Sequence, residues 1–189
     1  MKTNSNIAEI GIIGGTGVYD PALLKDTTEV YPDTPYGKPS SKIVIGTLAG
    51  KRVAFLNRHG SGHAIPPHLV NSRANISALK SLGVKHILAP TAVGSLQEDY
   101  KPGDLVIIDQ FIDRTHGRQS TFYDNGKVCH ISVADPFCPD LRDLLIKTGK
   151  SQGFAIHEKG TMVCVNGPRF STRAESFLFK SWGCHTINM

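Results

Sequence analysis

The sequence has 189 residues, of which 40% are hydrophobic and 20% charged, and its formal net charge is +5. This length fits a single domain with a buried core, so we expect residues 1–189 to form one domain. No apolar stretch reaches membrane-spanning length, and residues 1–6 lack the apolar segment of a signal peptide. The 21 Lys and Arg are scattered, which argues against a nucleic-acid partner and favours a small anion weakly.

The cysteine pattern indicates the compartment in which the protein works. The four of them show no Cys-x-x-Cys spacing and no dense framework. Reduced thiols in the cytoplasm are therefore expected.

The first predicted strand ends in a glycine-rich loop. Ile10, Ile12 and Ile13 are apolar and β-branched, which is typical of a buried strand of an α/β sheet, and the next residues are Gly14, Gly15, Thr16 and Gly17. Glycines let backbone N–H groups approach an anion such as phosphate, although a tight turn without a ligand explains the stretch equally well. No lysine follows as in a Walker loop, and Asp20-Pro21 breaks a dinucleotide fingerprint.

A second candidate loop follows strands predicted at residues 28–31, 41–48 and 52–56. The last of these leads into Asn57-Arg58-His59-Gly60. Arg58 offers a two-pronged donor for phosphate and His59 a further donor. Taken alone, this stretch is as well explained as a charged surface loop.

A third loop completes the pattern. The spacing of apolar residues predicts a helix over 68–82, ended by Gly83, and then a strand over 86–90. That strand leads into Thr91-Ala92-Val93-Gly94-Ser95. Because ligands in open α/β sheets bind at strand ends, we expect these three loops to share one anion pocket.

The second half of the chain continues the α/β alternation. We expect strands over 105–108 and 159–165, strand-like character over 128–133, and an irregular stretch over 109–123. A helix is expected to begin at Pro139, and a capping box over 172–175 predicts another helix start.

Two other kinds of site receive less support. His59 and His63 have a metal-ligand spacing only on a helix, which Gly60, Gly62 and Pro66-Pro67 forbid. Cys129 and His130 adjoin on a predicted strand, so their side chains point to opposite faces. We therefore expect no metal site and no thiol nucleophile.

Six blocks in order along the chain resemble the trimeric purine nucleoside phosphorylases, with 5′-methylthioadenosine phosphorylase as the nearest branch. They are residues 10–17, Arg58-His59-Gly60, residues 91–95, Pro102-Gly103-Asp104, residues 109–115 and residues 167–175. The resemblance implies a single α/β domain with a twisted mixed central sheet flanked by helices. It also implies phosphorolysis of 5′-methylthioadenosine to adenine and 5-methylthioribose 1-phosphate, in purine and methionine salvage.

The resemblance also implies a set of site residues. Phosphate would contact Thr16, Arg58, His59, Thr91 and Ala92. The nucleoside would contact His130 at the 5′ end, Phe170 and Ser171 at the base and Met189 under the ribose. Inorganic phosphate would be a co-substrate, with no metal or other cofactor, and the chain would form a homotrimer or a higher multiple.

One departure concerns the carboxyl-terminal end. Family chains continue past Met189 into a segment whose aspartates recognise and protonate the purine, so that acid is expected beyond this chain. Two alternatives therefore stay open. One is a phosphorylase for 6-oxopurine nucleosides or methylthioinosine, and the other is a truncated, non-catalytic binding fragment.

Overall fold

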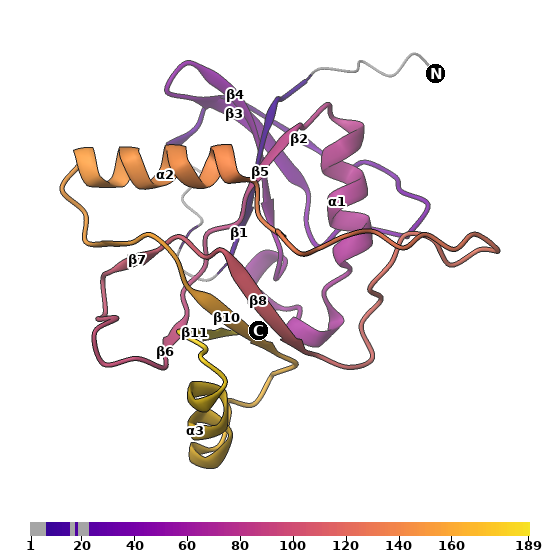
Figure 1. Cartoon of the computed structure of the whole chain (residues 1–189). Coiled ribbons are helices and arrows are strands. Elements are labelled where there is room, and N and C mark those ends of the chain that lie inside the picture. Colours follow the sequence, from indigo (N-terminus) through magenta and orange to yellow (C-terminus); the bar gives the residue numbers. More distant parts are fainter. Residues whose placement is uncertain (1–6, 16–17, 19–22) are drawn as a thin grey trace. The chain divides into compact units, whose positions relative to one another are not determined.

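The computed structural model describes residues 7–15, 18 and 23–189. Its contacts divide the chain into two compact units, of which the first comprises residues 1–92 and 118–122 and the second residues 93–117 and 123–189. Both units combine strands with helices (Figure 1). The α/β class with mixed sheets and helices is confirmed. The prediction of one domain over residues 1–189 is not tested by this division and stays a prediction.

The first unit is built on a five-stranded mixed sheet in the order β2-β3-β4-β1-β5. The strand β1 lies between β4 and β5 and is parallel to both, whereas β3 is antiparallel to β2 and β4. The strands of this sheet are β1 (Ile10–Gly14), β2 (Lys25–Val30), β3 (Ile43–Leu48), β4 (Lys51–Asn57) and β5 (His86–Leu88). The parallel trio places three strand ends, and hence three loops, at one edge.

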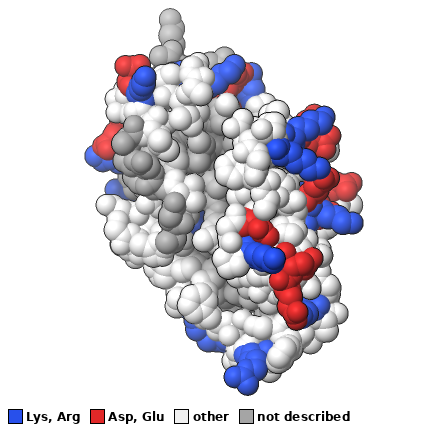
Figure 2. Space-filling model, turned by 90° about the vertical axis from the view of Figure 1, so that its left-hand side faces the viewer, with Lys and Arg blue, Asp and Glu red and all other residues white. Residues whose placement is uncertain are grey.

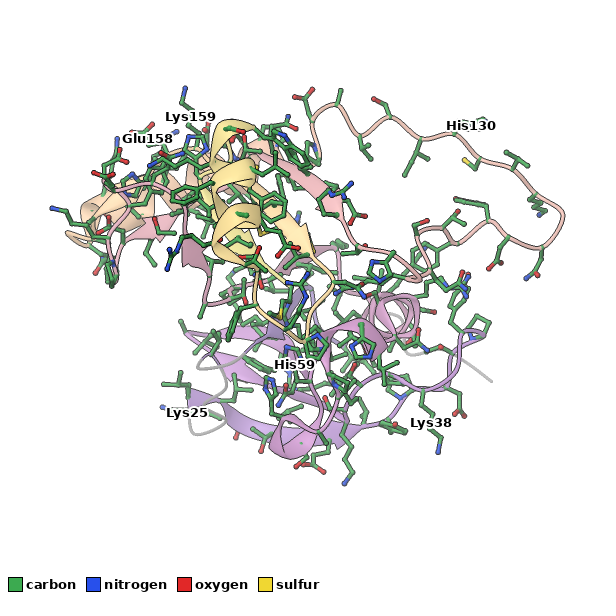
Figure 3. The ribbon with its side chains drawn as sticks, turned by 90° about the horizontal axis from the view of Figure 1, so that it is seen from below. Lys25, Lys38, His59, His130, Glu158 and Lys159 are labelled. Atoms are coloured by element: carbon green, nitrogen blue, oxygen red, sulfur yellow. The ribbon has the colours of Figure 1, made fainter. Side chains whose placement is uncertain are left out.

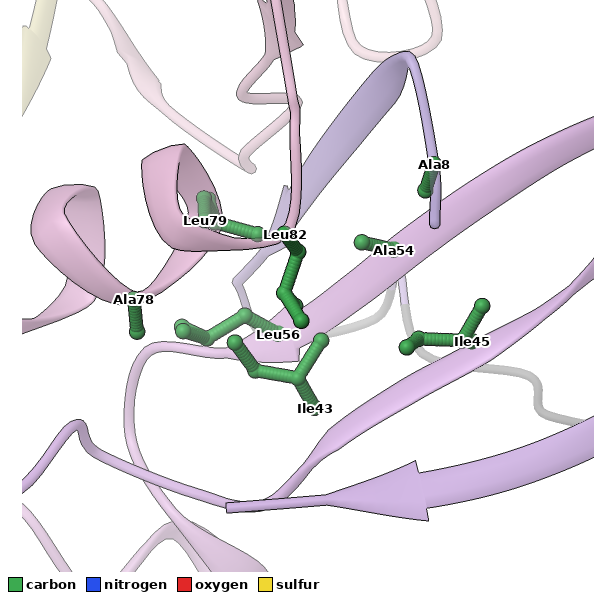
Figure 4. Close-up of a cluster of buried hydrophobic side chains, with 8 residues drawn as sticks. All are labelled: Ala8, Ile43, Ile45, Ala54, Leu56, Ala78, Leu79 and Leu82. Carbon is green, nitrogen blue, oxygen red and sulfur yellow. The ribbon is translucent and has the colours of Figure 1, made fainter. Parts of the chain in front are cut away.

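The core of this unit packs β3 and β4 against the helix α1 (Ser72–Ser81), as Figure 4 shows. Four consecutive residues are buried in β3 and four in β4, the pattern of strands covered on both faces. The helix contributes its alanine and leucine face. The cluster consists of Ala8, Ile43, Ile45, Ala54, Leu56, Ala78, Leu79 and Leu82.

The helix predicted over 68–82 is shorter in the structure. A 3₁₀ turn, η3 (Pro67–Leu69), precedes α1, and Val70 between them is extended. Asn71 then caps α1 by accepting a hydrogen bond from the backbone N–H of Ala74, so the cap fixes a later start than the apolar spacing suggests.

The second unit holds a four-stranded sheet in the order β6-β11-β10-β8 and a separate parallel pair, β7 with β9. Val163, Phe179 and Cys184 are buried in its core. Its helices are α2 (Pro139–Ser151) and α3 (Arg173–Ser181), and its strands are β6 (Gly94–Ser95), β7 (Leu105–Val106), β8 (Gln110–Arg114), β9 (Ile156–His157), β10 (Thr161–Val165) and β11 (Thr186–Asn188).

Two predictions in this unit are wrong. Residues 110–114, expected to be irregular, form β8, because their backbone pairs in parallel with all five residues of β10. Residues 128–133, expected to be strand-like, belong to no strand and are exposed. Their β-branched residues give local preference only, and a strand also requires a neighbour to pair with.

The start of α3 follows the predicted capping box. Thr172 Oγ1 accepts from the N–H of Glu175 at 3.2 Å, and the Glu175 carboxylate accepts from the N–H of Thr172 at 2.6 Å. Arg169 adds two hydrogen bonds to this carboxylate, at 2.8 and 2.7 Å. The Arg169 bonds, and next the Thr172 N–H, lower the pKa of Glu175 to about 2.

Replacing Thr172 with alanine is expected to lower the free energy of unfolding by about 1 kcal/mol, the usual cost of losing a helix N-cap. Equilibrium unfolding in urea measures this change. Ser181→Ala, at the other end of α3, serves as the control and should change stability by less than about 0.5 kcal/mol. Equal effects of the two substitutions would contradict the capping role.

Three further features concern the cysteines, the surface charges and the length of the helices. All four cysteines are thiols without a disulfide, and Cys184 packs as a buried residue. On the face drawn in Figure 2, basic side chains lie next to acidic ones. Lys85 and Glu9 form one exposed ion pair of the protein, with 3.0 Å between Nζ and Oε1. In the described ranges, no helix has the length and apolarity needed to cross a membrane.

Candidate active site

The candidate site lies at the carboxyl ends of three neighbouring parallel strands of the first unit. Gly14 at the end of β1 pairs with Asn57 at the end of β4, and Ile12 of β1 pairs with Leu88 at the end of β5. The residues that follow these ends include Gly15, Arg58 and Thr91. Such an edge is where open α/β sheets bind ligands.

Arg58 connects the three loops. Its backbone N–H donates to the carbonyl of Gly14 at 3.2 Å. One terminal nitrogen of its guanidinium donates to Thr91 Oγ1 at 3.3 Å, and its Nε donates to His59 Nε2 at 2.9 Å. The cationic group is therefore held against the ends of β1 and β5, which is the arrangement the sequence predicts.

Gly15 lets this arrangement close tightly. A Cβ atom at this position would lie 3.1 Å from Thr91 Oγ1 and 3.4 Å from both Nε and Nη2 of Arg58. A side chain here would crowd the Thr91 hydroxyl, whereas its distance to the guanidinium would be an ordinary contact. Gly15 is itself buried, so the missing side chain brings the backbone at the end of β1 close to the fixed positive charge of Arg58.

His59 is buried, with 3% of its surface exposed. Its Nδ1 lies 2.9 Å from the carbonyl oxygen of Ile65, and its ring stacks on that of His63 with 4.2 Å between centroids. Burial lowers the pKa of His59 below the usual 6.5, and the charge of Arg58 acts the same way, whereas the Ile65 hydrogen bond opposes both. His59 is therefore neutral at pH 7.

A neutral buried histidine makes stability depend on pH. Because the pKa of His59 is lower in the folded than in the unfolded chain, the unfolded chain binds more protons between the two values. The contribution of neutral His59 to the free energy of unfolding is thus fully present above the unfolded-state pKa of 6.5. It is lost as the pH falls through the folded-state pKa. Urea unfolding should show a smaller loss of stability between pH 7.5 and 5.5 in His59→Phe than in the unaltered chain; an equal loss would contradict this account.

The other predicted phosphate contacts are placed in part. Thr91 is half-buried and Ala92 is exposed, and the Thr91 hydroxyl also lies within hydrogen-bond distance of the Ala92 carbonyl, at 3.3 Å. Thr16 lies outside the described residues. The structure therefore brings Arg58, His59 and Thr91 together, and their binding of phosphate stays a prediction.

The predicted nucleoside contacts belong to the second unit. His130 lies on a long extended segment without helix or strand (Figure 3). Phe170 is 84% exposed, Ser171 Oγ shares a hydrogen bond with Ser176 Oγ at 2.9 Å, and Met189 follows β11 and donates its N–H to Asn188. Nothing within this unit tests their part in substrate binding, so it also stays a prediction.

Sequence reasoning missed two groups that hold the Arg58–His59 loop. The Asn57 side chain accepts from the N–H of His59 at 3.1 Å, a local turn that asparagine commonly makes and that could have been predicted. The Ile65 carbonyl, six residues from His59, is a backbone group, and no residue type signals its position.

The described ranges hold no group of three or more His, Cys, Asp and Glu side chains placed to bind a metal ion. His59 and His63 stack on each other, and both ring nitrogens of His59 have partners. The expectation that the protein needs no metal or other cofactor stays a prediction.

A comparison with protein-family profiles identifies the family of the chain. The profile of the phosphorylase superfamily matches residues 9–189. The chain belongs to this superfamily. The family predicted from the six blocks is therefore confirmed.

Within this superfamily, the chain is similar to proteins named S-methyl-5′-thioadenosine phosphorylase. The chain is 58% identical over 181 residues to the S-methyl-5′-thioadenosine phosphorylase of Thermofilum pendens, with 96% of this chain and 69% of the relative covered. It is also 58% identical to the enzyme of that name from Hyperthermus butylicus, covering 92% of this chain and 63% of the relative. It thus spans about two thirds of the length of these relatives.

Solved structures show the same similarity. The methylthioadenosine phosphorylase of Schistosoma mansoni in complex with adenine superimposes with a TM-score of 0.91 at 43% identity. The match covers 96% of this chain and 73% of that one. A structure of the Schistosoma mansoni enzyme with tubercidin gives a TM-score of 0.92.

Proposed function

We propose that the chain carries the phosphate-binding part of a 5′-methylthioadenosine phosphorylase and that it catalyses phosphorolysis of this nucleoside. A phosphate oxygen attacks ribose C1′ while the bond from C1′ to the purine nitrogen breaks. The departing purine takes up one proton, overall the one that hydrogen phosphate loses on becoming an ester, and the products are adenine and 5-methylthioribose 1-phosphate. The observation that carries the proposal is the Arg58 guanidinium held between Thr91 and His59 at the ends of parallel strands. Relatives of 58% identity with this activity in their names support it.

The chemistry suits these residue types. Cleavage of a glycosidic bond passes through a transition state with positive charge on the sugar, so an anion held beneath C1′ stabilises it directly. The protein then needs no nucleophile of its own, because phosphate forms the new bond. Fixing the phosphate in place also removes much of the entropic cost of bringing two substrates together.

The remaining parts of the proposal rest on resemblance. Thr16, His59 and Ala92 would complete the phosphate site, and His130, Phe170, Ser171 and Met189 would contact the nucleoside. Phosphate is a co-substrate, and no metal or organic cofactor takes part. The active protein is a homotrimer or a higher multiple in the cytoplasm.

The experiment that tests the proposal follows adenine release. The 189-residue chain is incubated with 5′-methylthioadenosine, with and without phosphate, and the bases are separated by chromatography. We expect release that depends on phosphate and saturates with it. Equal release without phosphate indicates hydrolysis by water and contradicts the proposal, and 5′-methylthioinosine in a parallel reaction tests the choice between 6-amino and 6-oxo bases.

A further inference from the structure

The second unit contains a pocket of its own, beside the parallel strands β7 and β9. Its volume is about 690 Å³, within the range of natural ligand pockets. Its lining comes from α2, from β9 and the residues after it, and from the segments on both sides of β7. Glu158 and Lys159, which follow β9 and line the pocket, are labelled in Figure 3. All of the lining residues belong to the second unit.

Arg142 of α2 fixes a positive charge in the pocket wall. Its Nε donates to the Ile108 carbonyl at 3.0 Å, and its Nη2 donates to the carbonyls of Ile107 at 3.4 Å and Glu158 at 2.7 Å. These carbonyls follow β7 and β9, so the guanidinium spans the ends of both strands. Its Nη1 has no hydrogen-bond partner among the described residues. The N–H groups of Nη1 therefore remain for solvent or a ligand.

Lys159 brings a second positive charge. Its side chain is exposed, and it forms no ion pair within the described part of the chain. Its backbone carbonyl accepts from the Tyr100 hydroxyl at 3.1 Å, so the place of Lys159 in the wall does not depend on its ammonium group. An unpartnered guanidinium nitrogen and an unpaired ammonium group in one pocket favour a carboxylate or another small anion.

Three carboxylates line the same pocket, and two of them have acceptor capacity left. Glu158 is paired with Lys150. Asp109 uses Oδ1 to accept from the N–H of Gly160 at 3.0 Å, and its Oδ2 has no hydrogen-bond partner among the described residues. The exposed Asp143 carboxylate likewise has none in the described ranges. These two free acceptors favour an ammonium group.

The charges together exclude ligands of a single sign. A purely anionic ligand would lie against unpaired carboxylates, and a purely cationic one against the guanidinium and the ammonium group, and like charges at close range repel. A small zwitterion, which carries one group of each sign, satisfies both halves of the pocket. A free amino acid is a molecule of this kind.

The rest of the wall is suited to an aliphatic side chain. Ile146 of α2 and Ile156 of β9 line the pocket. Beside them the ring of His157 stacks on that of Tyr100, with 3.7 Å between centroids and 11° between planes. Asp104 Oδ2 lies 2.8 Å from His157 Nε2 and holds the histidine ring in place. The wall is thus preformed, which lowers the cost of ordering it around a ligand.

We propose that this pocket binds a free amino acid with an aliphatic side chain. The carboxylate of the ligand is bound by the two cations, its ammonium group by the two carboxylates with free oxygens, and its side chain lies against the two isoleucines. The inference does not rest on the proposed phosphorolysis, because the pocket shares no residue with the strand edge of the first unit.

The first test uses L-leucine as the probe and ¹⁵N-labelled protein in two-dimensional NMR. We expect the backbone signals of Glu158, Lys159 and Gly160 to shift and to saturate in the millimolar range, as suits so small a ligand. 3-Methylbutylamine lacks the carboxylate and 4-methylpentanoate lacks the ammonium group, so each should bind about 10-fold or more weakly. Absence of these shifts at about 10 mM leucine, or equal binding of either analogue, would overturn the inference.

The second test changes one charge at a time. Lys159→Ala and Asp143→Asn should each weaken leucine binding about 10-fold, the effect of losing one hydrogen bond between charged groups. Both side chains are exposed, and circular dichroism checks that the variants fold. Lys147→Ala and Asp140→Asn, which alter exposed residues of α2 outside the pocket lining, are the matched controls and should bind leucine normally. Unchanged affinity in both test variants, or equal losses in the controls, would overturn the assignment.

Discussion

Replacing Arg58 with alanine is expected to lower kcat/KM for phosphate by about 10²- to 10³-fold, the usual cost of removing one preorganised donor from an anion site. Arg58 is the residue through which the loops after β1, β4 and β5 meet. Its loss removes a fixed positive charge and the guanidinium that both His59 Nε2 and Thr91 Oγ1 contact. Initial rates at varied phosphate and saturating nucleoside measure the effect.

Two further variants sharpen this result. Arg58→Lys keeps the charge but not the planar fork, so its activity should lie between that of the alanine variant and the unaltered chain. Arg52→Ala is the matched control, since Arg52 lies on β4, the strand that Arg58 follows, but is exposed and contacts Asp26 and Thr47. A phosphate KM within about threefold of normal in Arg58→Ala, against the expected loss, would contradict the assigned site.

The largest effect on stability is expected from Leu79→Ala, at about 2–5 kcal/mol of unfolding free energy. Leu79 is fully buried in the core of the first unit. Its Cδ1 would lie 3.4 Å from a Cβ built on Gly11 of β1, so it packs directly under the strand that carries the glycine loop. Removing it leaves a cavity that a sheet and a helix cannot close by small shifts.

Urea unfolding monitored by circular dichroism measures this loss. Leu69→Ala is the control, because Leu69 is a leucine of the same region with 65% of its surface exposed, and its replacement should cost less than about 0.5 kcal/mol. Similar costs for the two variants would show that Leu79 does not anchor the sheet.

Much of the first unit could be predicted from the sequence because its signals are local. The apolar runs of β3 and β4 are long and bounded by turn residues, and they appear as strands with shifts of only a few residues. In the second unit, the capping box at the start of α3 is likewise formed by the residues that predicted it, Thr172 and Glu175. Such patterns depend on neighbours in the chain and need no knowledge of distant contacts.

The two wrong secondary-structure predictions concern segments whose structure depends on distant parts of the chain. The strand β8 exists because β10 lies beside it, in a register that no local pattern encodes. The stretch 128–133 has strand-like residues and no strand to pair with. Pairing between distant segments thus decided both cases.

In the candidate site, too, some features could be predicted from the sequence and others could not. Arg58 and Thr91 could be predicted to meet because parallel strands end at one edge, and the structure places them 3.3 Å apart. The state of the His59 ring could not, because it depends on the backbone carbonyl of Ile65 and on burial. Residue types indicate which groups are available, whereas proton positions follow only from the folded contacts.

The most direct test of phosphorolysis is the identity of the sugar product. The chain is incubated with 5′-methylthioadenosine and phosphate, and ³¹P NMR and chromatography count sugar phosphate and adenine in the same sample. We predict one molecule of 5-methylthioribose 1-phosphate for each adenine released, with an equal loss of inorganic phosphate. Adenine accompanied by free 5-methylthioribose and unchanged phosphate would contradict the account, because water rather than phosphate would then have taken the sugar.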